Sequence, residues 1–224
     1  MPRVVIISDT HAMHGRVAVP DGDILVHCGD FTGTGRIAEV AAAGLWFRWM
    51  KERFSHVVVV AGNHDFLFER NRALAVDLIN NGQLHLREGR DGGITYLEDG
   101  EATLDGVRIY GSPVTPAFMG WAFNRERGED IRRHWDLVPA GLDLLVTHGP
   151  PMGILDQRFP LHGSEHLGCE ELMAAVERAR PRYHAFGHIH GGHGRSEHAD
   201  TTFLNASVLD ESYAVRNAPT VVDL

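Results

Sequence analysis

The 224-residue sequence predicts a mixed α/β fold, and two patterns along the chain support this prediction. Short β-branched runs alternate with stretches of helical periodicity, which is the order expected of a layered α/β domain. Several of these runs are followed directly by Asp, Asn or His, at the strand ends where open α/β sheets collect functional groups. We expect strands at residues 4–8, 24–28, 56–61, 107–111, 143–147 and 183–187, with two or three more after residue 200.

The longest helix is predicted over residues 36–54, and shorter helices are predicted over residues 77–81 and 169–180. The last of these ends before Pro181, because the residue that precedes a proline disfavours the helical conformation. Apolar residues recur near helical spacing in the longest helix at Ile37, Val40, Ala41, Leu45 and Trp49. The aromatic residues of that helix are expected in core and lid packing: Trp46, Phe47 and Trp49.

Two further segments have recognisable patterns. Residues 94–97 and 101–104 are close-set β-like runs joined by an Asp-Gly turn, which predicts a β-hairpin. Residues 112–128 are rich in aromatic side chains, broken by prolines and poorly periodic. Such a loop is either a packed Ω-like segment or the rim of a substrate site, and both interpretations stay open at this point.

The composition limits the classes of partner. The chain has 30 acidic and 21 basic residues and a net charge of −9, so it lacks the basic footprint of a general nucleic-acid binder. The apolar run near the N-terminus is shorter than that of a signal peptide, and no later run reaches membrane-spanning length. We therefore expect a soluble, cytoplasmic protein without a membrane partner. The oligomeric state is unknown from the sequence, and Cys28 is expected as a small buried residue.

Polar side chains at two strand ends have the arrangement of metal ligands. Asp9 and His11 stand at positions i and i+2, and they leave the strand end pointing the same way because side chains alternate along a strand. They can therefore hold one cation together. Asp30 follows the run at residues 24–28, and its carboxylate has two oxygens with which to bridge two metals.

Four more candidate ligands follow other predicted strands. Asn63 and His148 each come after an apolar run, while His188 and His190 repeat the i, i+2 spacing. The whole set supplies enough ligands for two ions. Because these residues extend from position 9 to position 190, dividing the chain would divide the site. We therefore expect residues 1–224 to form a single domain.

Each of these pieces has a structural explanation when it is taken alone. Asp9 or Thr10 could cap a helical turn, and Asn63 could begin an Asx-turn. Asp30 follows a glycine in a common loop pair, and His148 could be an ordinary loop residue before Gly-Pro-Pro. The joint appearance of all pieces, each after an apolar run, favours a metal site.

The ordered motifs carry a family resemblance. They are Asp9-x-His11, Gly29-Asp30, Gly62-Asn63-His64-Asp65, His148 and Gly187-His188-Ile189-His190. This pattern resembles the calcineurin-like metallophosphoesterase superfamily over residues 4–190. Three further sequence motifs resemble the small metallophosphoesterase-domain-containing subfamily, whose members are related to class III cyclic-nucleotide phosphodiesterases. These motifs are Trp121-Ala122-Phe123-Asn124, Thr147-His148-Gly149-Pro150-Pro151 and Asn205-Ala206-Ser207. The resemblance implies a four-layer αββα sandwich in which helices flank two mixed sheets.

The resemblance also implies a dinuclear centre. It assigns one ion to Asp9, His11, Asp30 and His190, and the other ion to Asp30, Asn63, His148 and His188, so that Asp30 bridges. Two ions about 3.5–4 Å apart can clamp a phosphate and lower the pKa of a shared water, so that a bridging hydroxide attacks near neutral pH. Mixed His, Asp and Asn ligands suit Mn, Fe, Zn, Co or Ni, and affinity order alone does not choose among these metals. Mn is the first candidate.

His64 stands next to a ligand in the sequence and is not counted as one. The resemblance implies that it binds the phosphate or protonates the leaving group, for which an imidazole is suited. The alternative is a hydrogen-bonding histidine in a turn. We predict His64 and Asp30 as catalytic residues, and Asn63 and His64 as substrate contacts.

Gly33 and Thr34 depart from the pattern of the protein phosphatases in this superfamily. Those enzymes have an Asp that orients the catalytic histidine and an Arg that grips a terminal phosphate. A monoester dianion would lose a charge-assisted partner here, whereas a diester has less need of one. The sequence therefore favours small phosphodiesters such as cyclic nucleotides. Asp65 is the candidate to orient His64 instead, and Arg125 is a candidate to replace the missing clamp.

Two other functions stay open. A phosphomonoesterase or protein phosphatase would use the same ions, although Gly33 and Thr34 speak against it. A metal-binding interaction module with little turnover would need the ions but no well-oriented His64. The remaining histidines without ligand spacing are expected in solvated or structural roles, with His193 near the pocket: His14, His27, His162, His166, His193 and His198.

Overall fold

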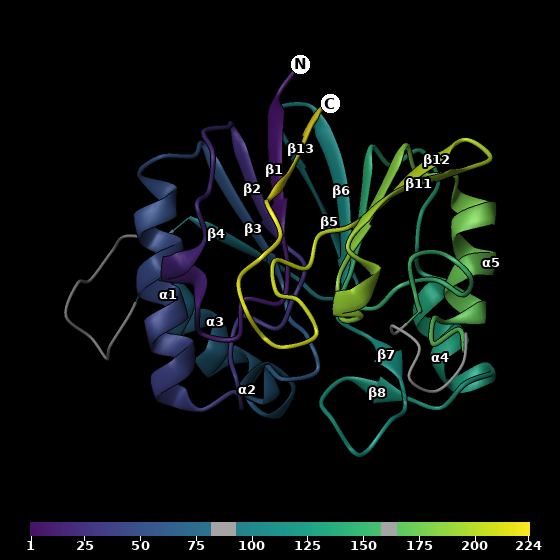
Figure 1. The fold of residues 1–224 in the computed structure, drawn as a ribbon, viewed down its shortest axis with the longest axis horizontal. Helices are drawn as coiled ribbons and strands as arrows, with labels where there is room; N and C mark the ends of the chain where they lie inside the picture. The colour runs from purple at the N-terminus through teal and green to yellow at the C-terminus, as the bar shows by residue number, and fades with distance from the viewer. Residues whose placement is uncertain (82–92, 158–164) are drawn as a thin grey trace.

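The computed structural model describes residues 1–81, 93–157 and 165–224. Over these residues the strands form a five-stranded sheet in the order β13-β1-β2-β3-β4 and a six-stranded sheet in the order β11-β12-β10-β9-β6-β5. Figure 1 shows helices α1 and α3 on the outer side of the first sheet, α2 below the ends of its strands, and α4 and α5 on the outer side of the second sheet. The predicted αββα sandwich is therefore confirmed.

The first sheet is mostly parallel. It contains β1 (Arg3–Ile7), β2 (Ile24–His27), β3 (His56–Val60), β4 (Ile94–Leu97) and β13 (Thr220–Asp223). Strands β1 to β4 run parallel, and β13 is antiparallel to β1. All parallel strands of this sheet therefore end at one edge, which is the edge where ligand binding is expected.

The second sheet has a parallel centre and antiparallel edges. It contains β5 (Gly100–Leu104), β6 (Val107–Ser112), β9 (Leu144–Thr147), β10 (Tyr183–Phe186), β11 (Gly194–His198) and β12 (Thr201–Asn205). Strands β6, β9, β10 and β12 are parallel, while β5 and β11 are antiparallel to their neighbours. A separate parallel pair joins β7 (Thr115–Pro116) to β8 (Asn124–Arg125). Six strands are predicted with residue ranges, and both ends of each range lie within one residue of the ends of an observed strand. The observed strands are β1, β2, β3, β6, β9 and β10.

The helices cover the outer faces. They are α1 (Ile37–Lys51), α2 (Phe66–Arg70), α3 (Arg72–Asn81), α4 (Glu129–Trp135) and α5 (Glu170–Ala179), with single 3-10 turns η1 (His14–Arg16) and η2 (His190–Gly192). The helices predicted at residues 36–54 and 169–180 are present. The one predicted at residues 77–81 is the last part of α3, which begins five residues earlier, at Arg72.

Alternation along the strands builds the core on both faces of each sheet. Val4 and Ile6 of β1 point between the two sheets, whereas Val5 and Ile7 point toward α1 and α3. In the second sheet, Val146 points between the sheets and Leu145 points toward α4 and α5. The buried layer between the sheets holds them face to face, so their strand ends meet.

The predicted β-hairpin at residues 94–104 is wrong. β4 pairs with β3 in the first sheet, whereas β5 pairs with β6 in the second. The chain crosses between sheets at Glu98 and Asp99. The hairpin that forms instead is β5–β6, with its turn at Asp105 and Gly106, both at positive φ. Spacing alone could not separate a hairpin turn from a crossover of the same length.

Helix α1 buries only part of the face that its apolar spacing suggests, because Val40 is buried but three of the other apolar residues are exposed. Trp46 and Phe47 are buried as expected, but Trp49 is 54% exposed, as are Leu45 at 65% and Ile37 at 55%. The buried face contains Gly44, where a Cβ would lie 2.6 Å from the backbone oxygen of Leu78. The expectation of core packing is therefore wrong for Trp49, because close contact with α3 selects the other face of the helix.

Over the described residues, no helix combines the length and apolarity that crossing a membrane requires. Cys28 is a free, buried thiol, as expected.

Candidate active site

The candidate ligands lie where the strand ends of the two sheets meet. Asp9 and His11 follow β1, and Asp30 follows β2; their loops are tied together because the Asp9 N–H donates to the Gly29 carbonyl at 3.0 Å and the His11 N–H donates to the Asp30 carbonyl at 2.9 Å. In the second sheet, the Gly187 N–H donates to the His148 carbonyl at 2.9 Å. Both sheets therefore present ligand loops at one edge.

Several ligand positions have a left-handed backbone. The φ angles are 54° at Asp9, 39° at His11, 56° at Asp30 and 66° at His188. Such conformations cost on the order of 1–3 kcal/mol each in non-glycine residues and cluster at functional sites. Strand alternation is therefore not what brings Asp9 and His11 together. The chain turns sharply after Ile7, and the turn aims both side chains into the site.

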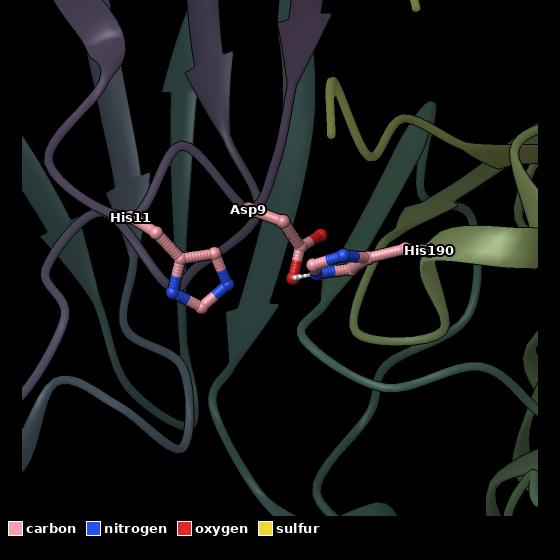
Figure 2. Close-up of side chains that lie close together, drawn as sticks. All are labelled: Asp9, His11 and His190. Carbon is pink, nitrogen blue, oxygen red and sulfur yellow. Dashed lines mark ion pairs between the residues drawn. The ribbon is translucent and has the colours of Figure 1, made fainter. Parts of the chain in front are cut away.

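Asp9, His11 and His190 form the first group, whose ligand atoms lie within 4.8 Å of one another. Figure 2 shows Asp9 between the two imidazoles, with the His190 ring against its carboxylate at 3.4 Å from Nε2 to Oδ1. The His190 Nδ1–H donates to the Asp210 carbonyl at 3.1 Å, so Nε2 faces the group. His11 Nε2 is buried and has no hydrogen-bond partner. A cation would satisfy this atom, so the group fits a metal ion.

Asp30, His148 and His188 form the second group, again within 4.8 Å. His148 Nε2 lies 3.3 Å from Asp30 Oδ2 and 2.8 Å from Asn63 Oδ1, which brings the amide oxygen of Asn63 to the same place. The His148 Nδ1–H donates to the Cys28 carbonyl at 3.0 Å. A backbone carbonyl thus fixes the orientation of the ring, as is usual for metal-binding histidines.

Asp30 is shared between neighbouring groups. It belongs to the second group and also to a third, with His11 and His64, in which the ligand atoms again lie within 4.8 Å. His188 and His190 do not act as a pair. His188 joins Asp30 and His190 joins Asp9, because the left-handed backbone at His188 turns the two side chains apart.

The charged groups in the site shift one another's pKa values. Burial opposes ionisation of Asp9, but its contact with the His190 imidazole and the charge of His148 outweigh that and hold its pKa below the usual range. Asp30 behaves alike: burial opposes ionisation, and the charge of His148 lowers its pKa. Burial also opposes protonation of His148, but Asp30 raises its pKa to about 9. Burial lowers the pKa of His188 to about 4. Both carboxylates are therefore anionic and can serve as ligands.

His64 is held by four contacts. Its Nδ1–H donates to the Gly33 carbonyl at 2.7 Å, and its backbone N–H donates to Asp30 Oδ1 at 2.7 Å. The Trp121 ring stacks on the imidazole at 4.2 Å between centroids and 30° between planes. His11 meets the ring edge-on at 4.6 Å. Nε2 is left facing the site, 3.9 Å from Asp30 Oδ2.

Asp65 does not orient the His64 ring, so that prediction is wrong. The side chain is fully buried and accepts hydrogen bonds from the backbone N–H groups of Asp30, Thr32 and Gly62 at 2.8–3.0 Å, and from the Thr32 hydroxyl at 2.7 Å. It therefore joins the loops after β2 and β3. The orienting group for His64 is the backbone carbonyl of Gly33, which no residue type in the sequence could reveal.

The loop at residues 112–128 is both packed and part of the site wall. Ala122 and Phe123 are buried in the core under the first sheet, and the Ala122 N–H donates to the Asn63 carbonyl at 3.2 Å. Trp121 lies against His64. The two interpretations of this loop are therefore compatible, because its buried residues anchor the aromatic one.

Arg125 is engaged away from the ligand groups. Its guanidinium donates to the Asn124 carbonyl at 2.7 Å, approaches Glu69 Oε1 at 3.6 Å and meets the His134 ring nitrogen at 3.3 Å. These contacts tie the side chain to Glu69 of α2 and His134 of α4. They leave the proposal of an arginine clamp at this position without structural support.

Several supporting residues had no role assigned from the sequence. A Cβ at Gly62 would lie 2.2 Å from Asp30 Oδ1, and a Cβ at Gly187 would lie 2.1 Å from Asp9 Oδ2. The motif glycines therefore leave room for the carboxylates. Asn205 donates to the Ile189 carbonyl at 2.9 Å, so it fixes the loop between His188 and His190.

The histidines outside the ligand groups have varied surroundings. His27 is buried beside Thr10, His14 packs 5.2 Å from the Trp46 ring, and His166 contacts Asp156 at 2.7 Å. His162 lies outside the described residues.

An αββα sandwich with ligand groups of this kind is the architecture of a metal-dependent phosphoesterase. The sequence profile of the family described as Calcineurin-like phosphoesterase matches residues 2–192. The Homo sapiens protein named metallophosphoesterase domain-containing protein 1 is 39% identical over 236 residues, which cover 99% of this chain and 71% of that protein. A UPF0046 protein of Caenorhabditis elegans is 39% identical over 223 residues, covering 98% of this chain and 74% of that protein.

Solved structures agree on the fold. The crystal structure of phosphopantetheinyl hydrolase from Mycobacterium tuberculosis has a TM-score of 0.58 at 17% identity and covers 91% of this chain and 88% of its own. A second solved structure has a TM-score of 0.66 at 17% identity, with 92% and 90% covered. The chain belongs to the calcineurin-like phosphoesterase family. Its class is thus that of phosphoester hydrolases, which typically bind a dinuclear divalent metal centre.

Proposed function

We propose that this chain hydrolyses small phosphodiesters, cyclic nucleotides among them, with two divalent ions of which Mn is the first candidate. The observation that carries the proposal is that two ligand groups lie side by side. His11 of the first group and Asp30 of the second group belong together to the third group. The seven ligand residues are Asp9, His11, Asp30, Asn63, His148, His188 and His190. We also propose that residues 1–224 act as one domain, and the cytoplasmic location stays a prediction.

The two groups have the donors that such ions need. Asp9, His11 and His190 would hold one ion, while Asn63, His148 and His188 would hold the other, with Asp30 between them. When bound, the ions would supply positive charge at the phosphoryl oxygens and an activated water near neutral pH. The Gly62 and Gly187 positions support this assignment, because side chains there would displace the two carboxylates.

His64 is proposed as the residue that touches the leaving group. Its Nδ1–H is committed to the Gly33 carbonyl, so only Nε2 is available to the site. From that atom a protonated imidazole can donate a proton to the departing oxygen. Trp121 and the backbone contact with Asp30 restrict the ring to this orientation. A proton donor that is fixed in this way favours a catalytic function over that of a module that only binds metal ions.

The preference for diesters rests on the surroundings of His64. The position of Gly33 offers a neutral carbonyl, and Thr34 is bound to Glu39 through its N–H at 3.0 Å and its hydroxyl at 2.9 Å. Arg125 is engaged elsewhere. A monoester dianion would therefore lack the bidentate cationic partner that suits it, whereas a diester has a single negative charge.

One panel assay tests the proposal. Metal-free protein is reloaded with Mn, Fe, Zn, Co or Ni and tested on bis(p-nitrophenyl) phosphate, p-nitrophenyl phosphate, and 2′,3′- and 3′,5′-cyclic nucleotides. We expect kcat/KM to be higher for the chromogenic diester than for the monoester, with hydrolysis of at least one cyclic nucleotide. A monoester preference with every metal would overturn the diester assignment but keep the hydrolase. No turnover of any ester would favour the interaction module.

A further inference from the structure

An exposed tyrosine borders the first ligand group. The Tyr213 ring lies 5.1 Å from the His11 ring and 5.0 Å from the His190 ring, measured between centroids. Tyr213 is nevertheless 52% exposed. The ring therefore covers the edge of the ligand histidines while it still offers surface to a molecule that enters the site.

Tyr213 is held in this place by the same atom that orients His190. The Asp210 carbonyl accepts the Tyr213 N–H at 2.9 Å and the His190 Nδ1–H at 3.1 Å. The Asp210 carboxylate accepts the N–H groups of Ser212 and Ala214 at 2.9 and 3.0 Å. Tyr213 itself has φ of 60°. The tight turn therefore fixes the position of the tyrosine relative to the ligand group.

The two aromatic residues at the site border different partners. Trp121 has one ring face stacked on His64, the proposed proton donor to the leaving group. Tyr213 borders His11 and His190 in the first ligand group. A phosphodiester has two organic arms, of which one departs and one stays on the phosphate. The leaving arm belongs beside His64, so the remaining arm needs a second surface.

We propose that Tyr213 is a specificity-determining residue that stacks on the non-leaving arm of the substrate when that arm carries an aromatic ring, such as a nucleobase. The proposal rests on the phosphodiesterase function proposed above. Stacking of a base on an aromatic side chain changes affinity by about 5- to 100-fold. A substrate whose remaining arm has no ring gains nothing from Tyr213.

Two diesters with one leaving group isolate this contribution. Thymidine 5′-(p-nitrophenyl) phosphate and methyl p-nitrophenyl phosphate both release nitrophenolate, and they differ only in the arm that remains. For Tyr213→Ala we expect kcat/KM to fall by about 5- to 100-fold on the thymidine ester and to stay unchanged on the methyl ester. Tyr213→Phe keeps the ring and should keep the preference.

A binding experiment without turnover gives a second readout. Calorimetry of the Mn-loaded protein compares adenosine 5′-monophosphate with ribose 5-phosphate, which lacks the base. The wild-type protein should bind the nucleotide more tightly, and Tyr213→Ala should abolish the difference. Trp49→Ala is the control, because Trp49 is similarly exposed, at 54%, on the outer helix α1.

Metal content and thermal stability of Tyr213→Ala are measured alongside. Equal losses on the thymidine and methyl esters would overturn the proposal, since Tyr213 would then act only through His11 and His190. Equal affinity of the wild-type protein for the nucleotide and the sugar phosphate would also overturn it. Absence of hydrolysis combined with a Tyr213-dependent nucleotide preference would instead refute the phosphodiesterase function and leave the stacking role standing.

Discussion

The two sheets contribute different chemistry to the site. Loops after the first sheet supply Asp9 and Asp30, which are the carboxylates of the ligand groups, whereas loops after the second sheet supply imidazoles only. Each carboxylate pairs with an imidazole from the opposite sheet. His190 Nε2 lies 3.4 Å from Asp9, and His148 Nε2 lies 3.3 Å from Asp30. The site is therefore divided by charge along the boundary between the sheets.

This division links the site to the packing of the sheets. The carboxylates are buried, and burial alone would raise the pKa of each. Imidazoles from the other sheet reverse that shift, so the anionic form needs both sheets in place. The apolar layer that holds the sheets together includes Val26 and Val146. By keeping the sheets face to face, this layer also keeps the Asp9 and Asp30 carboxylates anionic.

The sheets resemble each other in one respect. Each has a buried histidine behind a ligand loop: His27 meets the Thr10 hydroxyl at 3.0 Å, and His184 meets the Thr147 hydroxyl at 2.8 Å. His27 also accepts the Gly29 N–H on Nδ1 at 3.2 Å, whereas the Nδ1 of His184 is buried without a partner. The support in the first sheet is therefore more fully bonded.

The largest effect is expected from Asp30→Ala. Asp30 belongs to two neighbouring ligand groups, whereas His148 belongs to one. Asp30→Ala should lose most of both ions and nearly all turnover, while His148→Ala should lose one ion and keep the other. Metal analysis of the purified variants measures this. Two retained equivalents in Asp30→Ala would contradict the bridging position.

His64→Ala should follow in size. The variant should keep both ions, while turnover falls by about 10²–10⁴-fold, the usual contribution of a positioned acid or base. Because nitrophenolate needs little protonation, the loss should be smaller for nitrophenyl diesters than for diesters with poor leaving groups. Equal losses across leaving groups would show that His64 binds the phosphate and does not donate a proton.

Trp121→Ala should have a moderate effect through His64. An aromatic stack is worth about 0.5–1.5 kcal/mol, which corresponds to a loss of about 2- to 10-fold in turnover. Trp121→Phe should restore most of the rate, and the metal content should not change. If His64→Ala is already present, Trp121→Ala should cause no further loss. Additive losses in the double variant would rule out a role through His64.

The smallest expected effect concerns folding stability, which the two buried histidines His27 and His184 should make dependent on pH below neutrality. Burial lowers the pKa of His27 and of His184 to about 3, from the usual 6.5. The folded state keeps them neutral while the unfolded state takes up protons below pH 6.5. Stability should therefore fall as the pH drops from 6.5 toward 3, by about 1.4 kcal/mol per histidine per pH unit.

Urea unfolding between pH 7 and pH 4.5 measures this slope. His27→Gln and His184→Gln should each reduce the pH dependence of the unfolding free energy by about 1.4 kcal/mol per pH unit. At pH 7, His27→Gln should cost more stability, because both ring nitrogens of His27 are bonded and one of His184 is not. An unchanged slope in both variants would show that other groups control the acid sensitivity.

Local patterns in the sequence predicted most of the secondary structure and the residues that gather at the site. The strand positions came from apolar runs, and the ligand set came from polar residues that follow those runs. Both signals are local, since strand ends of parallel sheets lie at one edge whatever the sheet order. The ligand groups contain Asp9, His11, Asp30, His148, His188 and His190, all of which were expected from the sequence.

Tertiary structure decided what depends on contacts between distant segments. It placed β4 and β5 in different sheets, turned Trp49 outward, and gave the orientation of His64 to the carbonyl of Gly33. It also brought Tyr213 beside His11, 202 positions away in the chain. A periodic pattern records which face of a segment is apolar, but it does not record which segment covers that face. Backbone groups have no residue type at all, so only the folded chain shows where they donate and accept.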